Sequence, residues 1–462
     1  LSSIDTPDKE NAMQHALIEK YGEARLPRYT SYPTAPAFSP SVGAGTYGDW
    51  LSAIAPGTEA SLSLHMPFCR SMCWYCGCHT TITKKDEPIA AYLEALRREI
   101  ELVAECIERP LPVNHIHFGG GTPTIISPEQ FSGLIHLLER RFVLQPGAEI
   151  AVEIDPRTLT PEMIRELGAS GVTRASLGVQ SFDPVVQRAI NRIQSFEETA
   201  AATEGLRAAG IRGVNFDLIY GLPHQTAQSC VETVKQALQL APDRFSVFGY
   251  AHVPAFKKHQ RKIDEEVLPD GSGRHEQVEA INRALIDAGY RQIGLDHFAR
   301  GDDSLARAQA TGKLHRNFQG YTTDSSDTLI GVGASAIGRL SQGYIQNEIA
   351  IRSYCTQIGN NELATRKGYV LTADDRLRAD IIERLMCDLG VDLAAVGARH
   401  RTAPEPLLQQ ATRLRPLMDD GIVRVTGSRI AIADDARHLV RSVAAAFDAY
   451  IGTSGRTHSR AV

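Results

Sequence analysis

The sequence predicts an α/β fold in which a parallel sheet of about six βα units curls into a partial, open barrel. An N-terminal arm precedes the barrel, and a mainly helical C-terminal domain follows it. Two observations predict this fold: short apolar runs alternate with helix-length amphipathic segments from residue 62 to residue 250, and the alternation stops near Tyr369. We therefore divide the chain into an arm or lid at 1–50, a barrel at 51–368 and a C-terminal helical domain with a small hairpin at 369–462.

The six units follow one another at regular spacing. The first strand, 62–65, leads into a cysteine-rich loop and a helix at 88–107, and the second strand, 114–118, leads into three glycines and a helix at 128–141. Chemistry in such barrels sits at the carboxyl ends of the strands. The unusual residues follow strand ends, which makes them candidate site residues. The other four strands are expected at 149–154, 173–177, 213–218 and 245–250.

The C-terminal segment does not continue the alternation of strands and helices. Thr372 with Asp375 predicts a helix cap, 422–425 and 430–432 predict a hairpin, and a last helix is expected to end near Ile451. Helices followed by a hairpin could form a DNA-binding winged helix. The 13 Lys and Arg against 12 Asp and Glu after residue 370 are too balanced for that task, so we expect a cap or lid.

The overall composition is that of an ordinary globular protein. Hydrophobic residues make up 43% of the 462 residues and charged residues 22%, and the formal net charge is −5, so we expect no nucleic-acid partner. We find neither a run of about 18 apolar residues nor a signal peptide. We therefore expect a cytoplasmic monomer without a membrane partner.

Four of the eight cysteines lie within ten residues, at Cys69, Cys73, Cys76 and Cys78. A disulfide framework suits a small secreted domain, and a zinc site needs a second ligand pair that this chain lacks. Three thiolates on one loop can hold three irons of a [4Fe–4S] cluster and leave the fourth iron open. We assign Cys69, Cys73 and Cys76 to that role and leave out Cys78, because one residue is too short a bridge from Cys76.

The spacing of these three cysteines resembles the signature of the radical S-adenosylmethionine (SAM) superfamily, which implies a barrel of that type. The glycine run of Gly119, Gly120 and Gly121 lets backbone N–H groups approach an anionic ligand, which favours a site for the aminocarboxylate of SAM.

Further segments make the resemblance more specific. Taken together, they are similar to the oxygen-independent coproporphyrinogen III oxidase family, from about residue 20 to the C-terminus. The arm and the segment 315–323 are the specific parts, because many radical enzymes share the cysteine loop. The segments are 28–35, 69–78, 119–124, 153–157, 178–182, 191–192, 217–223, 250–252, 296–300 and 315–323.

The resemblance implies a reaction of haem biosynthesis. Two propionate side chains of coproporphyrinogen III lose carbon dioxide and hydrogen and become the vinyl groups of protoporphyrinogen IX. The family uses a [4Fe–4S] cluster and two SAM molecules, and a 5′-deoxyadenosyl radical takes a hydrogen from the propionate β-carbon. A reducing protein such as flavodoxin or ferredoxin is expected to supply electrons.

The resemblance also implies site residues by position. One SAM would contact Gly120, Glu153 and Ile337; the second would contact Tyr75, Gly121, Thr122, Gln180, Arg192, Asp217 and Ala251. No catalytic residue is assigned, and Glu153 and Gln319 are the candidates. The family has a tyrosine near the first SAM where this chain has Ser63. That difference either is tolerated, or weakens turnover, or marks a paralogue acting on another tetrapyrrole.

The substrate carries four carboxylates, so its pocket needs cations. The candidates are Arg28 with Tyr29 and Tyr32 on the arm, Arg300 with His297, Arg316 with His315, and the basic stretch 257–262, which we interpret mainly as a solvated surface. Two alternatives stay open: a non-catalytic haem-binding protein, and a radical methylase or ring-modifying enzyme.

Overall fold

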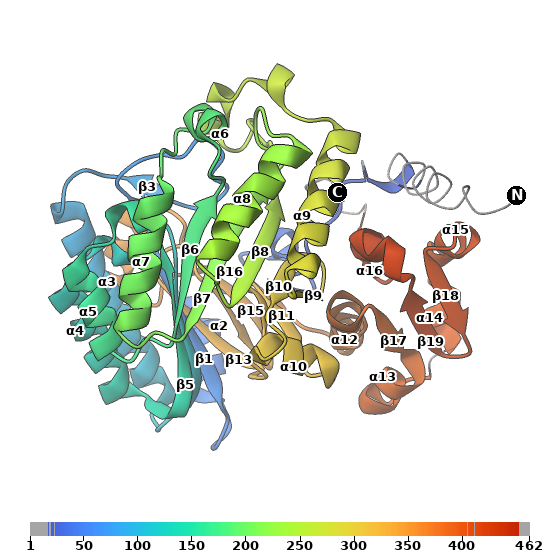
Figure 1. Cartoon of the computed structure of the whole chain (residues 1–462). Helices are drawn as coiled ribbons and strands as arrows, with labels where there is room; N and C mark the ends of the chain where they lie inside the picture. The colour runs from blue at the N-terminus through green and yellow to red at the C-terminus, as the bar shows by residue number, and fades with distance from the viewer. Residues whose placement is uncertain (1–16, 18–19, 23, 404, 411, 452–462) are drawn as a thin grey trace, which may run out of the picture.

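A large twisted sheet with helices packed along one side forms the main body of the molecule (Figure 1). The computed structural model describes residues 17, 20–22, 24–403, 405–410 and 412–451. Within that part of the chain the sheet has twelve strands in the order β16-β15-β14-β13-β1-β4-β5-β6-β7-β8-β10-β9.

The centre of the sheet consists of the six predicted parallel strands. Each strand is followed by a helix that packs back on the sheet, which is the right-handed crossover arrangement of βα units. The six-unit open barrel is therefore confirmed, with strands a few residues longer than predicted. The strands are β1 (Ala60–Met66), β4 (Pro112–Gly120), β5 (Val143–Ile154), β6 (Arg174–Gln180), β7 (Gly213–Tyr220) and β8 (Arg244–Gly249). The helices are α3 (Glu87–Ile107), α4 (Pro128–Arg141), α5 (Pro161–Ala169), α6 (Pro184–Ala189), α7 (Phe196–Ala208), α8 (Ala227–Gln239) and α9 (Gly271–Asp287).

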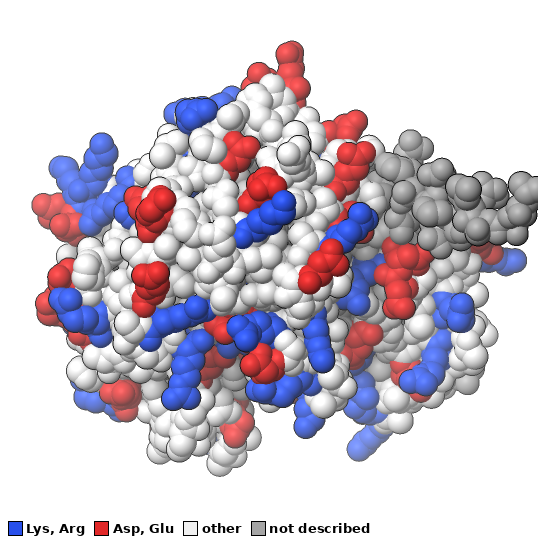
Figure 2. Space-filling model, in the orientation of Figure 1, with Lys and Arg blue, Asp and Glu red and all other residues white. Residues whose placement is uncertain are grey.

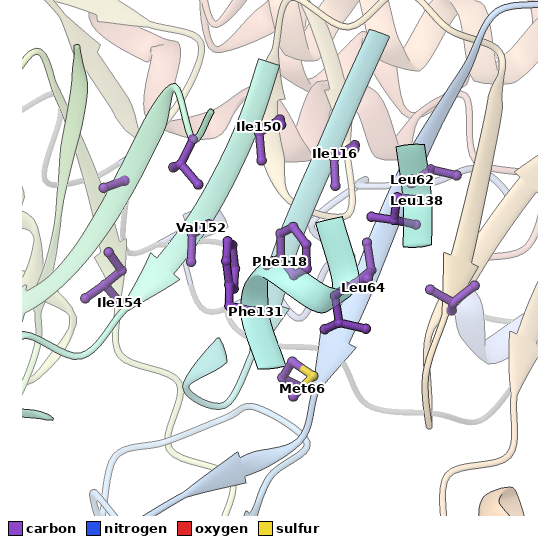
Figure 3. Close-up of a cluster of buried hydrophobic side chains, with 14 of the residues drawn as sticks. Leu62, Leu64, Met66, Ile116, Phe118, Phe131, Leu138, Ile150, Val152 and Ile154 are labelled. Atoms are coloured by element: carbon purple, nitrogen blue, oxygen red, sulfur yellow. The ribbon is translucent and has the colours of Figure 1, made fainter. Parts of the chain in front are cut away.

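Successive side chains of each strand point in turn toward the hydrophobic core and toward the barrel interior. Leu62, Leu64 and Met66 of β1 are buried in one cluster with Phe131 and Leu138 of α4 (Figure 3). Burying each such side chain contributes about 1.5–3 kcal/mol to the fold. Because side chains of a strand alternate between faces, the intervening positions 61, 63 and 65 face the barrel interior.

Both edges of the sheet continue beyond the predicted strands. β13 (Thr328–Val332) pairs in parallel with β1, and three antiparallel strands extend from it; antiparallel β10 and β9 extend the other edge from β8. These strands were not predicted, because each is only three to six residues long and several of them contain glycine. At Gly343, for example, a Cβ atom would collide with the carbonyl oxygen of Tyr369 on the neighbouring strand. The added strands are β14 (Ile337–Leu340), β15 (Gly343–Asn347), β16 (Thr365–Val370), β9 (Arg291–Ile293) and β10 (His297–Ala299).

Shorter elements connect the sheet to the loops around its carboxyl end. They are α2 (Ala44–Ser52), β2 (Phe68–Cys69), β3 (Thr81–Ile82), α10 (Ser304–Ala310), β11 (His315–Asn317), β12 (Gly320–Thr322) and α11 (Ile351–Gly359). Single 3₁₀ turns lie at Ala35–Ala37, Pro123–Ile125, Pro156–Thr158, Lys258–Lys262 and Glu265–Val267.

The C-terminal segment has its own hydrophobic core, to which Leu26, Tyr29 and Tyr32 of the arm contribute. The predicted cap is present, because the Thr372 side chain and Asp375 form a capping box, and the hairpin forms as β18 and β19. Its elements are α12 (Ala373–Asp388), β17 (Gly390–Asp392), α13 (Leu393–His400), α14 (Glu405–Gln410), α15 (Leu414–Asp419), β18 (Val423–Thr426), β19 (Arg429–Ile432), a 3₁₀ turn at Asp434–Leu439 and α16 (Val440–Ala445).

The prediction that the last helix ends near Ile451 was wrong. α16 ends at Ala445, after which backbone bonds such as the one from the Phe447 N–H to the Ala444 carbonyl tighten the chain and bury Phe447. In the described part of the chain, every helix is too short or too polar to cross a lipid bilayer.

Candidate functional site

The cysteine loop begins where β1 ends, and polar side chains from other elements surround its sulfur atoms. The hydroxyls of Thr80 and Thr122 each donate to Cys69 Sγ at 3.4 Å. The guanidinium groups of Arg157 and Arg192 each donate to Cys73 Sγ at 3.6 Å. Hydrogen bonds and positive charge at sulfur favour the thiolate, which is the form that binds iron.

The titration of the loop cysteines is uneven. Burial raises the pKa of Cys69, against the effect of its two threonine donors. A hydrogen bond from Cys78 is the largest effect on its neighbour and lowers the pKa of Cys76 to about 6. In the described residues no three Cys, His, Asp or Glu side chains converge as ligands of a single metal ion. Three loop thiols with four converging donors fit a cluster in which each thiolate binds a different iron.

The glycine run holds the start of the cysteine loop. The N–H groups of Gly121 and Thr122 donate to the carbonyls of Met66 and Phe68, both at 2.8 Å, and the Gly120 N–H donates to Glu153 Oε2 at 3.0 Å. In this structure the N–H groups of Gly120 and Gly121 therefore bond within the protein, and the expected approach of the glycine run to an anionic ligand stays a prediction. The glycines permit close packing: a Cβ at Gly121 would lie 2.8 Å from the backbone nitrogen of Phe68.

Two predicted carboxylates, Glu153 and Asp217, lie in one cavity of about 180 Å³ inside the barrel, together with the exposed Gln319. Burial, followed by the nearby Glu153 charge, raises the pKa of Asp217 to about 6. Burial also raises the pKa of Glu153. His117 Nε2 lies 3.6 Å from Glu153 Oε1, but burial lowers the pKa of His117 to about 4, so this histidine is neutral at pH 7. The two carboxylates therefore fit a cationic ligand group such as the ammonium or sulfonium of SAM.

A second group of predicted residues lies around Arg192. Its Nη2 donates to the Gly178 carbonyl at 2.6 Å and pairs with Asp155 at 3.4 Å. A Cβ at Gly178 would lie 2.8 Å from the Gln180 side-chain nitrogen, so the glycine leaves room for both side chains. Gln180 itself adopts φ of +66°, a conformation that costs a non-glycine residue energy and clusters at functional sites.

The remaining predicted residues lie close to these two groups. The Gln260 side chain donates to the carbonyls of both Tyr75, at 3.0 Å, and Ala251, at 3.2 Å, which ties the cysteine loop to the end of β8. Ser63 stands opposite His117 on β4 and opposite Gly331 on β13. A Cβ at Gly331 would lie 3.1 Å from the Ile337 nitrogen, so Ser63 and Ile337 flank the same glycine.

A larger cavity of about 890 Å³ opens beside the carboxyl ends of β7 and β8. Arg28 of the arm lines it together with Ala251 and Arg316, and the C-terminal residues Arg437 and Arg441 close one side. Seven arginines line the cavity against six Asp and Glu. Arg300 lies outside its lining and is half exposed beside Asp302, so that part of the cation prediction was wrong.

Arg316 is the cation most clearly placed for a carboxylate. Its side chain is only 5% exposed, and its guanidinium lies 4.4 Å from the Tyr321 ring centroid and 3.8 Å from Asp296. Its Nε and Nη1 atoms have no hydrogen-bond partner among the described residues. Arg316 lines the cavity, and a guanidinium that has hydrogen-bond donors left over beside its ion pair with Asp296 can bind a carboxylate.

Sequence reasoning missed the part that the segment 257–262 plays. Lys257 Nζ donates to the Cys78 carbonyl at 2.9 Å, and His259 Nε2 donates to the Cys76 carbonyl at 2.7 Å. Lys262 Nζ lies 5.5 Å from the centre of the Trp74 ring. The interpretation of this stretch as a solvated surface was therefore wrong for Lys257 and His259, whereas Lys262 is exposed as expected. A run of charges carries no local signal of which loop it will cover.

Comparison with known proteins agrees with this geometry. Residues 63–237 match the model of the radical SAM superfamily, and residues 371–439 match the HemN C-terminal domain. The oxygen-independent coproporphyrinogen III oxidase of Bradyrhizobium diazoefficiens is 63% identical over 450 residues, which cover 97% of this chain and 100% of that protein. This chain belongs to the oxygen-independent coproporphyrinogen III oxidase family.

Other members of the family agree. The oxygen-independent coproporphyrinogen III oxidase of Escherichia coli is 40% identical over 444 residues, covering 96% of each chain. The solved structure of the Escherichia coli coproporphyrinogen III oxidase, described as a radical SAM enzyme, superposes with a TM-score of 0.89 at 38% identity, covering 95% of this chain and 99% of that one.

Proposed function

We propose that this protein is a radical SAM oxidoreductase that converts two propionate side chains of coproporphyrinogen III to vinyl groups without oxygen. The observation that carries the proposal is the cysteine loop, where two donors converge on the Cys69 sulfur and two on the Cys73 sulfur. The carboxylates Glu153 and Asp217 line a cavity of the same barrel. The 63% identity to a named coproporphyrinogen III oxidase over nearly the whole chain supports the substrate.

When bound, the [4Fe–4S] cluster and SAM supply the 5′-deoxyadenosyl radical that starts the reaction. The protein's own part is to hold these groups and to balance their charges. Cys69, Cys73 and Cys76 would ligate the cluster, while Arg157 and Arg192, oriented by Asp155, donate to the Cys73 sulfur and would offset the negative charge of the bound cluster.

The two SAM molecules would be held by the residues that surround this loop. Glu153 would accept from the ammonium of the first molecule, because its half-buried carboxylate has the Gly120 N–H as its one backbone donor. The second molecule would lie between the Arg192 group and the carbonyl end of β8. The full proposed set is Ser63, Gly120, Glu153 and Ile337 for the first, and Tyr75, Gly121, Thr122, Gln180, Arg192, Asp217 and Ala251 for the second.

The substrate would occupy the cavity of about 890 Å³ beside these residues. Arg316 would hold one propionate, and Arg28 of the arm would cover the cavity, so that the radical forms in a site shielded from water. Gln319 stays a candidate for contact with the reacting side chain, because it lines the barrel cavity together with Glu153 and Asp217.

A reducing protein such as flavodoxin or ferredoxin would supply the electron that starts each turnover. The monomeric state, the cytoplasmic location and the division at residues 50 and 368 also stay predictions.

The proposal is tested by anaerobic reconstitution with iron and sulfide, followed by incubation with SAM, dithionite and coproporphyrinogen III. We expect chromatography to show the three-carboxylate intermediate and then protoporphyrinogen IX. Cleavage of SAM with a methylated tetrapyrrole instead would make the protein a methylase, and retention of haem without cleavage would make it a haem-binding protein.

A further inference from the structure

The cysteine loop reaches the surface of the molecule. Gly77 and Cys78 are exposed, and so are Thr81 and Ile82 of β3, which follow them. Two segments hold the loop from either side: the stretch around α6, and the stretch 253–263 between β8 and α9. Trp74 and Tyr75 of the loop pack in one apolar cluster with Val186 and Ile190 from the first stretch and Ile263 from the second.

The outer side of the same segments carries apolar side chains that nothing in the described chain covers. Phe256 is 73% exposed, Ile193 is 62% exposed and Val185 is 47% exposed. Ile82 follows the loop, and Ile349 lies beside it because its carbonyl accepts from His79. In the part of the chain that the structure describes, these are five of the nine exposed large hydrophobic side chains. Apolar residues concentrated at one place mark an interaction surface.

The charge of this face differs from that of the whole protein. The segments 70–87, 183–193 and 256–266 contain eight Lys and Arg that are at least partly exposed, against six Asp and Glu, in a chain of net charge −5. Three of the acids already have partners: Asp86 pairs with Arg70, Asp183 caps α6, and Glu265 pairs with His252 at 2.9 Å. Lys258 and Arg261 are exposed beside Phe256. Figure 2 shows basic side chains at the upper left edge, at the end of the molecule where Figure 1 places α6 and β3.

We propose that this face, defined by Phe256, Lys258, Arg261, Val185 and Ile193, docks a small acidic electron-donor protein directly over the cysteine loop. The inference rests on the proposed function, because a redox cluster bound in the loop is the group that would accept the donor's electron. In the step, the reduced donor loses one electron and the cluster gains it, and no bond forms or breaks. An apolar centre with a basic rim suits an acidic partner that must bind, deliver an electron and leave.

The test compares two reductants on the reconstituted protein. In the double variant Lys258→Glu/Arg261→Glu, we expect 5′-deoxyadenosine formation driven by reduced flavodoxin to fall at least about tenfold at about 0.05 M salt. Dithionite needs no docking surface, so its rate should stay within about twofold of the parent protein. Calorimetry should show flavodoxin affinity reduced by a similar factor. Phe256→Ala should weaken flavodoxin binding without changing its dependence on salt.

A matched control reverses the charge of two other exposed cations, Arg165 on α5 and Lys235 on α8. Equal loss of flavodoxin-driven rate in Arg165→Glu/Lys235→Glu would overturn the docking proposal, since overall charge would then explain the effect. Unchanged flavodoxin binding in the first double variant, or an equal loss with dithionite, would also overturn it. Failure of the parent protein to cleave SAM with dithionite would instead refute the proposed function itself.

Discussion

We predict that the Asp217 carboxylate, which serves ligand binding, lowers the stability of the folded protein. The variant Asp217→Asn measures this cost. The carboxylate lies in the barrel cavity, where it accepts from Ser176 Oγ at 3.0 Å and from Asn215 Nδ2 at 2.8 Å. Among the described residues no Lys or Arg forms an ion pair with it, and Glu153 is close enough to raise its pKa further. Replacing it with Asn keeps the size of the side chain and removes the charge.

The magnitude follows from the pKa. Burial and the Glu153 charge raise the pKa of Asp217 from 3.8 to about 6 in the folded protein, so ionisation costs the folded state roughly 3 kcal/mol more than the unfolded state. Because the side chain is only half-buried, this figure is an upper limit. The raised pKa favours the folded state fully below pH 4, and the advantage is lost as pH rises through 6. The Asn variant has no such loss.

Urea denaturation of the cluster-free protein from about pH 4 to about pH 8 measures this effect. The free energy of unfolding of Asp217→Asn minus that of the parent should rise with pH by about 2 kcal/mol, mostly between pH 4 and 6.5. The difference cancels the titration of groups that do not interact with Asp217. Asp49→Asn, an exposed change on α2, should show no comparable rise. A flat difference for Asp217→Asn would refute the reasoning, because the carboxylate would then ionise in the folded state without cost.

Three further predictions concern the cluster, the first SAM and the substrate. Cys69→Ala, Cys73→Ala and Cys76→Ala should each abolish the bound iron and visible absorption gained on anaerobic reconstitution, whereas Cys78→Ala should keep both; loss in Cys78→Ala as well would reassign the ligand set. Ser63→Tyr should raise the yield of decarboxylated product per SAM cleaved, because a larger ring packs at the first SAM; equal yields from both forms would remove any role for this position. Arg316→Lys should raise the KM for coproporphyrinogen III about tenfold or more, since one charge-assisted hydrogen bond is worth roughly 1.5–3 kcal/mol. Substrate-free SAM cleavage serves as the control for Arg316→Lys, and an unchanged KM would place the propionate elsewhere.

The features that the sequence predicts well are local ones. The α4 helix begins at Pro128 after a Ser127 capping box and ends at Arg141, as its pattern indicates, and the six parallel strands follow from their apolar runs. The cysteines and Glu153 could be placed because strand ends in a parallel barrel meet at one edge.

Contacts between distant segments could not be predicted in the same way. Nothing local in residues 257–262 reveals that Lys257 and His259 will donate to the cysteine loop, 179 and 183 residues away from their acceptors. The glycine run is a second example. Its pattern indicated a close backbone approach, and the structure shows one to Phe68, a contact that the pattern itself could not name. Which partner fills such a gap depends on tertiary packing.

The most direct test of the central proposal follows one hydrogen atom. Coproporphyrinogen III carrying deuterium at the propionate β-carbons is incubated anaerobically with the reconstituted protein, SAM and dithionite, and the 5′-deoxyadenosine is analysed by mass spectrometry. We predict that deuterium appears in the 5′-deoxyadenosine as protoporphyrinogen IX forms. Formation of the same product with unlabelled 5′-deoxyadenosine would contradict the account.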